Sequence, residues 1–320
     1  MLDNIEVLCH SSIRISKNKV IYIDPFKIDK NYNDADIIFI THDHYDHYSE
    51  EDIDKVINKN TIIVIPEEMI AKLLRKGIDK NSILVVKPNE EYMVQGIKFE
   101  TIPSYNVNKK FHPKENNWVG YIITIDEVRY YIAGDTDITE ENRKVKCDVA
   151  FVPVGGTYTM SFEEAAQLIN EIKPQVAVPI HYGSVVGTEQ DAKDFILKSV
   201  MNKFDLSSEA AQKIIDARDE GLTFNIRDDL DGSSQILTAF LTDEAKAKYN
   251  ATTSNPLAGS SESNQTISEN KSNKLYDIDD GGTSFIKDGV GRNINETINI
   301  FLAINIRCSK CYNAKCNVIK

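Results

Sequence analysis

Short apolar runs separated by polar turns fill the chain from Ile5 to about Ile180. They include VIYID, DIIFIT, TIIVI, VGYIITI and VAVPI, and they are rich in isoleucine and valine. Runs of β-branched residues at this length are typical of strands, and runs without polar interruption are typical of strands buried on both faces. The pattern therefore predicts a domain with many strands.

Three segments with helical signals interrupt these strands. SEEDIDKVI begins with the N-cap residue Ser49, PEEMIAKLLRKG is bounded by Pro66 and Gly77, and SFEEAAQLINEI begins with a Ser161/Glu164 capping box. The strands come first in pairs and later alternate with helices. This order predicts an α/β domain in which layered sheets are covered by helices.

The composition divides the chain into three parts. Residues 1-227 are predicted to form one globular domain, with a core at 4-204 and an extension at 205-227 made of one helix and one strand. Residues 228-300 are predicted to be a largely disordered linker, because NATTSNPLAGSSESNQTISENKSNK has few aliphatic side chains to offset the entropy of ordering. Residues 301-320 form a short cysteine-containing tail, to which the sequence assigns no role.

The overall charge limits the classes of partner. The 320 residues carry a formal net charge of -12, which repels nucleic acid, so no nucleic acid is expected. No apolar run approaches the roughly 20 residues of a membrane span. The first residues do not have the pattern of a secretion signal, and we expect a cytoplasmic protein that acts on a small molecule. The sequence does not indicate whether the chain forms an oligomer.

One stretch concentrates side chains that bind metals. THDHYDHYSEED directly follows the apolar run ADIIFI and includes the helix start predicted at Ser49. His42 and His44 lie two residues apart, so in an extended loop both point to one side and can hold one metal ion. Asp46 and His47 lie where the chain turns into the helix and can face a second metal ion.

Two further candidate ligands follow later strands. Asp135 comes after VRYYIAG and His181 after VAVPI, the same kind of strand-to-loop position that His42 occupies. A carboxylate can bridge two cations, and this role is assigned to Asp135. A single His or Asp at a strand end is more often an ordinary polar group, but the joint pattern favours a metal site.

These motifs resemble those of a known superfamily. THDHYDH, IPSYN with FHPK, GYIITIDEVRYYIAGDTD, DVAFVPVGGTYTM and VAVPIHYG extend over about residues 4-200. In this order they resemble the metallo-β-lactamase superfamily, and within it the metal-dependent hydrolases similar to ascorbate-6-phosphate lactonase and the N-acyl phosphatidylethanolamine phospholipases. The resemblance implies a four-layer αββα sandwich with a dinuclear metal site between its sheets, here followed by a low-complexity C-terminal tail.

One position departs from the superfamily pattern. Many relatives place a third histidine of the first site in a motif like P-A-x-H, where this chain reads PSYN and ends at Asn106. His112, in the following FHPK, is the predicted substitute. If His112 instead only lines the pocket rim, the first site keeps two histidines and one aspartate, and metal binding there should be weak.

The resemblance and the spacing together predict the ligand sets and the reaction. The predicted ligands are His42, His44 and His112 for one ion, Asp46, His47 and His181 for the other, and Asp135 for both. Zinc is the first choice for the two divalent ions, and manganese or iron are alternatives. A hydroxide held between the ions is predicted to attack an ester, lactone or phosphodiester, with Asp46 and Asp135 as the catalytic carboxylates and Asp46 orienting the hydroxide.

The neighbouring loops contain candidate substrate contacts. These are Tyr105, Asn106, Lys109, Lys110, Lys114, Tyr158 and Tyr182. The three lysines stand out in an acidic chain and are consistent with a small anionic substrate. A solvated surface loop explains the same lysines, and the sequence leaves both interpretations open.

A second hypothesis assigns the protein to another class. A metal-binding interaction or scaffold protein could keep the hydrolase fold and use its C-terminal tail as the partner-binding part. The tail contains Cys308, Cys311 and Cys316, but a closed structural zinc site takes four ligands, and no nearby histidine supplies the fourth. The cysteines therefore give this hypothesis little support.

Overall fold

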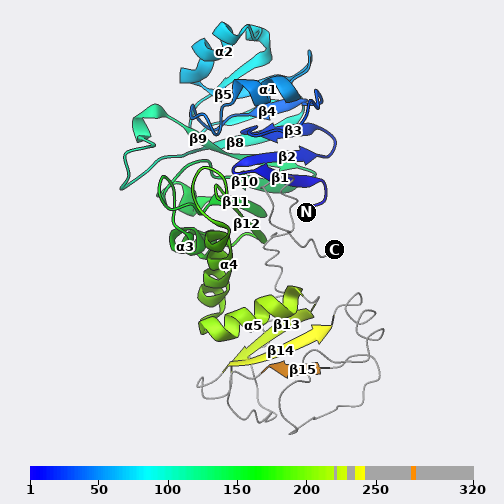
Figure 1. The fold of residues 1–320 in the computed structure, drawn as a ribbon, viewed down its shortest axis with the longest axis vertical. Coiled ribbons are helices and arrows are strands. Elements are labelled where there is room, and N and C mark those ends of the chain that lie inside the picture. The colour runs from blue at the N-terminus through cyan, green and yellow to red at the C-terminus, as the bar shows by residue number, and fades with distance from the viewer. Residues whose placement is uncertain (220–221, 229–234, 242–274, 279–320) are drawn as a thin grey trace. The chain divides into compact units, whose positions relative to one another are not determined.

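Two six-stranded sheets lie within Met1–Ser199 (Figure 1). The computed structural model describes residues 1–219, 222–228, 235–241 and 275–278. The first sheet contains, in spatial order, β1 (Ile5–Cys9), β2 (Ser12–Ser16), β3 (Val20–Ile23), β4 (Ile37–Phe39), β5 (Ile62–Pro66) and β6 (Ile83–Val86). The pairs from β1 to β3 are antiparallel, and those from β3 to β6 are parallel.

The second sheet mirrors this arrangement. It contains β7 (Glu91–Val94), β8 (Ile97–Pro103), β9 (Val119–Ile125), β10 (Val128–Ile132), β11 (Val149–Pro153) and β12 (Val176–Ile180). The pairs from β7 to β10 are antiparallel, and those from β10 to β12 are parallel. Each sheet therefore has one parallel half, in which successive strands end at the same edge.

Helices connect the strands. The α-helices are α1 (Glu50–Val56), α2 (Ile70–Lys76), α3 (Phe162–Ile172), α4 (Glu189–Phe204) and α5 (Ser208–Asp219), and the short 3₁₀ helices are η1 (Glu67–Met69), η2 (Lys80–Ser82), η3 (Lys114–Asn116) and η4 (Asn142–Lys144). Within the described part of the chain, no helix has the length and apolar character needed to cross a membrane.

The predicted helix signals agree with the structure except at Pro66. Ser49 caps α1 by accepting a hydrogen bond from the backbone N of Asp52, and Ser161 begins a complete capping box at α3. Gly77 ends α2 with a left-handed backbone at φ 90°. Pro66 is the last residue of β5, and η1 separates it from α2, so the proline does not occupy the first turn of the α-helix.

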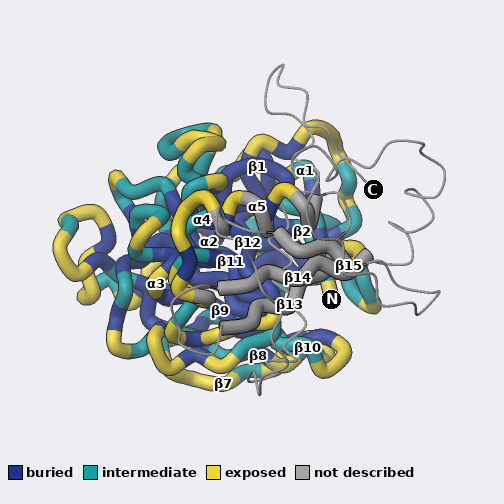
Figure 2. The backbone as a smooth tube through the Cα atoms, turned by 90° about the horizontal axis from the view of Figure 1, so that it is seen from below, coloured by how far each residue is buried: buried dark blue, intermediate teal, exposed yellow. Residues whose placement is uncertain are grey.

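The two sheets face each other across an apolar core. Successive residues of a strand point to opposite faces. In β3 and β4, Ile23 and Phe39 therefore lie in the core between the sheets, whereas Tyr22 and Ile38 belong to a second core beneath α1 and α2. Figure 2 shows buried positions running along the strands of both sheets.

The outer face of the second sheet is covered by α3. This helix contacts β11 and buries a stripe that includes Ala165, Ala166 and Leu168. Such a stripe at helical spacing is expected of a helix that covers a sheet. Helices therefore cover both outer faces, and the predicted αββα sandwich is confirmed.

A second unit, Val200–Asn299, is described separately. It contains α5 and an antiparallel sheet with the order β13 (Leu222–Asp228), β14 (Gln235–Leu241) and β15 (Leu275–Ile278). The sequence prediction joined residues 205-227 to the hydrolase domain, whereas the structure groups them with the strands that follow.

β14 and β15 lie inside the predicted linker. The run QILTAFL has the composition of a strand, and it pairs with all of β13. Polar residues on both sides concealed this signal in the sequence. The rest of residues 228-300, and the tail with Cys308, Cys311 and Cys316, lie outside the described residues.

Candidate metal centre

The loop after β4 carries four of the predicted ligands. Asp24, which follows β3, accepts hydrogen bonds from the backbone N (2.8 Å) and the hydroxyl (2.7 Å) of Thr41. A tight turn follows, in which the carbonyl of His44 accepts hydrogen bonds from the backbone N atoms of His47 and Tyr48. These contacts fix the loop between β4 and α1 and turn its histidines toward one space.

The first cluster contains His42, His44, His112 and Asp135, whose ligand atoms lie within 4.8 Å of one another. Nε2 of His42 is 3.1 Å from Nδ1 of His44. Oδ2 of Asp135 is 3.2 Å from Nε2 of His112 and 3.8 Å from Nε2 of His42. The indole of Trp118 packs against the rings of His42 and His44, each at a centroid distance of 4.9 Å. It covers one side of the cluster and limits how far the rings can turn.

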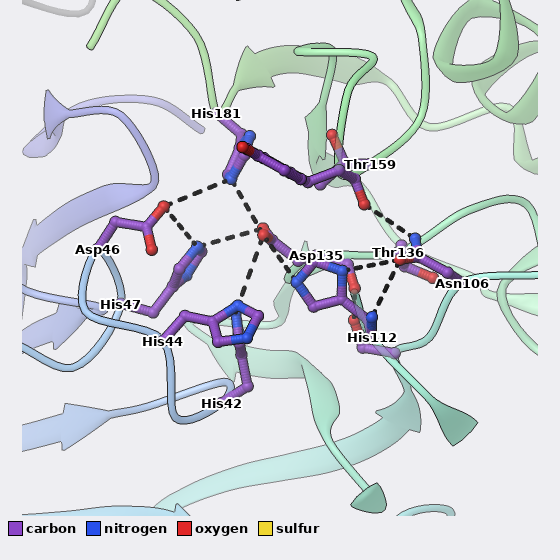
Figure 3. Close-up of polar contacts among 12 residues, drawn as sticks. His42, His44, Asp46, His47, Asn106, His112, Asp135, Thr136, Thr159 and His181 are labelled. Atoms are coloured by element: carbon purple, nitrogen blue, oxygen red, sulfur yellow. Dashed lines mark hydrogen bonds and ion pairs between the residues drawn. The ribbon is translucent and has the colours of Figure 1, made fainter. Parts of the chain in front are cut away.

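Asn106 orients His112. Its Oδ1 atom accepts a hydrogen bond from the backbone N of His112 at 3.1 Å and lies 2.9 Å from the ring atom Nδ1. Its Nδ2 atom donates to the carbonyl of Tyr158 at 2.9 Å. An acceptor at Nδ1 places the ring proton there and leaves Nε2 to face Asp135. His112 is only 1% exposed, so it lies inside the cluster and not at a pocket rim (Figure 3).

The second cluster lies around the same carboxylate. Oδ1 of Asp135 is 3.2 Å from Nε2 of His47, and Oδ2 is 3.0 Å from Nε2 of His181. Oδ2 of Asp46 is 3.8 Å from Nε2 of His47 and 3.7 Å from Nε2 of His181. His10 adjoins this group, with Nε2 at 3.4 Å from Oδ2 of Asp46. Figure 3 shows Asp46, His47 and His181 on one side of Asp135 and His112 on another.

The structure brings together every predicted ligand. They occupy three overlapping groups, namely His42, His44, His112 and Asp135, then His10, Asp46 and His181, then His47, Asp135 and His181. The chain has 6 histidines, and all of them belong to these groups. Because all the histidines gather in these groups, the site is suited to a metal ion that imidazole binds.

Charges within the centre shift the pKa values of its groups. Burial acts to raise the pKa of Asp135, but His181 and His47 hold it well below its ordinary value. Burial acts to lower the pKa of His47, but Asp135 and Asp24 raise it well above its ordinary value. Burial, together with His47, lowers the pKa of His42. Asp135 is therefore ionised and His42 neutral, which are the forms that bind metal ions.

Several polar atoms of the centre are buried without a hydrogen-bond partner. Among the described residues they include Nε2 of His10, His47, His112 and His181 and Oδ1 of Asp135. Such atoms are uncommon in folded proteins, and they usually bind a water molecule or an ion. Imidazole nitrogens around a carboxylate suit divalent transition metals. The residues therefore fit a metal site.

The sequence interpretation missed two residues of the centre, His10 and Asp24. His10 lies in the turn between β1 and β2, and Asp24 directly follows β3. Asp24 lies 2.7 Å from Nδ1 of His47, on the side of the ring opposite Asp135. Both occupy strand-end positions like that of His42, and this shared position was the signal that could have identified them.

Five of the seven predicted substrate contacts line one pocket of about 780 Å³. They are Tyr105, Asn106, Lys109, Lys110 and Lys114, joined by Arg143 and others. Because Asn106 also holds His112, the pocket adjoins the first cluster.

Acidic side chains neutralise much of the positive charge in this pocket. Lys109 pairs with Asp137 at 2.6 Å, and Lys114 pairs with Glu141 at 2.9 Å. Within the described residues, no ion pair involves Lys110, which is exposed.

The two other predicted contacts do not line this pocket. The ring of Tyr158 packs edge-on against Phe111 at a centroid distance of 4.6 Å, and its carbonyl accepts the hydrogen bond from Asn106. The carbonyl of Tyr182 lies 3.5 Å from Nδ1 of His10. Both residues therefore support the metal centre through their backbone carbonyls.

The N-terminal part of the chain is similar to known metal-dependent hydrolases. The family model of the β-lactamase superfamily domain matches residues 4–181. A UPF0173 metal-dependent hydrolase from Caldivirga maquilingensis is 31% identical over 201 residues, which cover 59% of this chain and 86% of that protein. The crystal structure of a candidate metal-dependent hydrolase from Parabacteroides distasonis is 34% identical with a TM-score of 0.50, and the match covers 57% of this chain and 83% of that one.

A more distant structure shares the fold. Igni18, a metallo hydrolase from Ignicoccus hospitalis, is 23% identical with a TM-score of 0.52, and the match covers 61% of this chain and 89% of that one. The family match, the similarity to the Caldivirga protein and the clustered histidines all concern the same sandwich domain. The chain therefore belongs to the metallo-β-lactamase superfamily, within the UPF0173 family of metal-dependent hydrolases.

Proposed function

We propose that the protein uses two divalent metal ions to hydrolyse an ester, lactone or phosphodiester of a small anionic molecule. Zinc is the preferred metal, and manganese and iron are the alternatives. The position of Asp135 carries this proposal. Its Oδ1 atom lies 3.2 Å from His47, and its Oδ2 atom lies 3.0 Å from His181 and 3.2 Å from His112. A carboxylate that faces two imidazole clusters is suited to bridge two ions.

The clusters support the predicted ligand sets. We assign His42, His44 and His112 to one ion, Asp46, His47 and His181 to the other, and Asp135 to both. When bound, two such ions acidify a water molecule and polarise the bond to be cleaved. The chain itself supplies the fixed carboxylates and the imidazoles that would hold the ions.

Asp46 is the group proposed to orient the attacking water. Burial acts to raise its pKa, but the surrounding histidines lower it, so the carboxylate is ionised and can accept a hydrogen bond from water. No thiol nucleophile is needed. Burial, with Asp148 adding to it, raises the pKa of Cys147 to about 12, which keeps this thiol protonated at neutral pH.

The pocket beside Asn106 supports an anionic substrate. Lys110 is exposed there and has no described acidic partner, while Lys109 and Lys114 lie close to it in the chain. A small phosphate or carboxylate bound in this pocket would lie beside Asn106, the residue that orients His112. The lactone and phosphodiester classes also agree with the finer resemblance of the motifs to lactonases and phospholipases.

Metal analysis of three variants tests the proposal. His181→Ala is expected to lose mainly one ion, His112→Ala mainly the other, and Asp135→Ala to bind both more weakly. Turnover of a lactone, a carboxylic ester and a phosphodiester should stop on chelation and return with Zn²⁺ or Mn²⁺. Two tightly bound ions in Asp135→Ala, or hydrolysis that survives full metal removal, would contradict the proposal.

A further inference from the structure

His10 is buried against the second cluster. It lies in the turn between β1 and β2 with a left-handed backbone at φ 57°, and its side chain is 0% exposed. The carbonyl of His10 accepts a hydrogen bond from the backbone N of His181 at 3.1 Å, and the two rings lie 4.0 Å apart between centroids. The turn is therefore tied to the residue after β12, and the imidazole is held beside a predicted metal ligand.

The ring presents its Nε2 atom to the second cluster. Nε2 lies 3.4 Å from Oδ2 of Asp46, and the ligand atoms of His10, Asp46 and His181 all lie within 4.8 Å of one another. Two neighbouring ligands of one zinc ion lie about 2.8 to 3.4 Å apart when each bond is about 2.0 to 2.1 Å, depending on the number of ligands. The separation of His10 and Asp46 matches this spacing.

The other ring nitrogen indicates which tautomer is present. Nδ1 lies 3.5 Å from the carbonyl of Tyr182, which can only accept a hydrogen bond. If the proton of a neutral imidazole is at Nδ1, Nε2 carries a lone pair. This lone pair then faces the acceptor Oδ2 of Asp46, and Nε2 makes no hydrogen bond. In this tautomer two acceptors face each other at a buried site, and a cation between them relieves the repulsion.

We propose that His10 is a ligand of the second metal ion, together with Asp46 and His181. The assignment rests on the proposed two-metal function and extends it, because the predicted ligand set for this ion did not include a residue from the N-terminal hairpin. It makes the β1–β2 turn part of the metal centre. It also gives every histidine of the chain a metal-binding role.

Counting metal-bound imidazoles in the unmodified protein tests the assignment directly. The chain has 6 histidines, and five of them are already assigned as ligands. In protein with isotope-labelled histidine and two equivalents of Zn²⁺, nitrogen NMR should therefore show a metal-bound nitrogen on all six rings. Five metal-bound rings and one free ring would overturn the assignment. This measurement needs no variant and does not depend on turnover.

Variants separate a ligand from a hydrogen-bond donor. His10→Phe keeps the ring that packs on His181, and His10→Gln keeps a donor that can reach Asp46. If His10 is a ligand, both should weaken binding of the second ion by more than about 100-fold, the upper end of the effect of losing an outer hydrogen-bonding partner. Near-normal affinity in His10→Gln, within about 10-fold of the unmodified protein, would mean that His10 only positions Asp46.

Two controls make the outcome specific. Ser11→Ala changes the next residue of the same turn, which is buried and is not a proposed ligand, and it should retain both ions. The fluorescence of Trp118, the single tryptophan, reports on the first cluster and should respond to its ion equally in all variants. If the unmodified protein holds one ion, the two-metal function is wrong, and His10 is a ligand only if both His10 variants lose that ion.

Discussion

Nδ1 of His47 lies 2.7 Å from Oδ2 of Asp24, and both side chains are buried. The same carboxylate accepts hydrogen bonds from the backbone and the hydroxyl of Thr41. Asp24 therefore fixes both the start of the histidine loop and the orientation of one of its rings. With Nδ1 held in this way, Nε2 of His47 faces Asp135 at 3.2 Å. A carboxylate behind a histidine is a common means of orienting a metal ligand and raising its basicity.

Asp24→Asn is expected to weaken metal binding by about 10- to 100-fold, because the amide cannot provide the charge that makes His47 a strong ligand. The fold should persist, since the amide oxygen can still accept the hydrogen bond from the backbone N of Thr41. Competition with a chelator of known affinity measures the change. Asp36→Asn, at the other end of β4, serves as the control, and equal affinities in the two variants would disprove the role of Asp24.

His112→Ala should weaken metal binding about as much as His44→Ala, because the two residues belong to the same cluster. Asn106→Ala is expected to have a smaller effect, about 10-fold, since it removes only the group that orients His112. Metal content after dialysis against a series of free Zn²⁺ concentrations gives the order of the three variants. Full occupancy in His112→Ala would show that the ring is not a ligand.

Much of the sandwich could be predicted because its strands are buried on both faces. In the run around Ile38, neighbouring apolar residues alternate between the core between the sheets and the core under the helices. The run is therefore continuously apolar and is easily recognised as a buried strand. The sheet of β13, β14 and β15 was harder to predict. A long polar segment separates β14 from β15, and a run as short as QILTAFL is too short to show a clear periodic pattern.

The metal centre was predictable where ligands recur at one kind of position. His42, Asp135 and His181 each follow a strand, and their order matches a superfamily pattern. His10 and Asp24 also follow strands, but they lie outside the spaced motif, and the pairing of β1, β2, β3 and β4 brings them to the same edge. The role of Asn106 was also hidden, because its partner depends on the path of the loop that carries His112.

Tyr121→Phe is expected to lower the free energy of unfolding by about 1-3 kcal/mol. The hydroxyl of Tyr121 in the second sheet donates a 2.6 Å hydrogen bond to the carbonyl of Ile40, at the start of the histidine loop. Both groups are buried, so the substitution leaves a carbonyl without this partner. Urea unfolding measures the loss. Tyr32→Phe, whose hydroxyl bonds Asp29 at an exposed site, should change stability by less than about 0.5 kcal/mol.

Glu141→Gln should reduce the loss of folding stability that occurs when the pH is lowered. Burial acts to raise the pKa of Glu141, but Lys114 and Tyr105 hold it at about 2, below the ordinary 4.5. A carboxyl group whose pKa is lower in the folded than in the unfolded state stabilises the folded state at pH values above the unfolded-state pKa. This stabilisation is lost as the pH falls from 4.5 to 2. Because Lys114 is largely exposed, solvent screens the pair and the gain in stability at neutral pH is small. Urea unfolding at pH 7 and pH 3 should differ less in Glu141→Gln than in the unmodified protein, and an equal difference would contradict this account.

Lys110→Ala tests the proposed preference for anionic substrates. The side chain is exposed, lines the pocket beside Asn106, and has no acidic partner among the described residues. Removing its charge should raise KM for an anionic substrate by roughly two- to five-fold, in line with the modest strength of exposed ion pairs. The kcat value should stay the same because Lys110 does not contact the metal ligands.

Added salt should reduce the difference in KM between Lys110→Ala and the unmodified protein, since it screens exposed charges beyond about 10 Å at 0.1 M. A neutral substrate of the same shape is the internal control, and Lys80→Ala, an exposed lysine outside the pocket, is the matched variant. If Lys110→Ala changes the KM of the neutral and the charged substrate equally, the lysine shapes the loop and does not attract the anion.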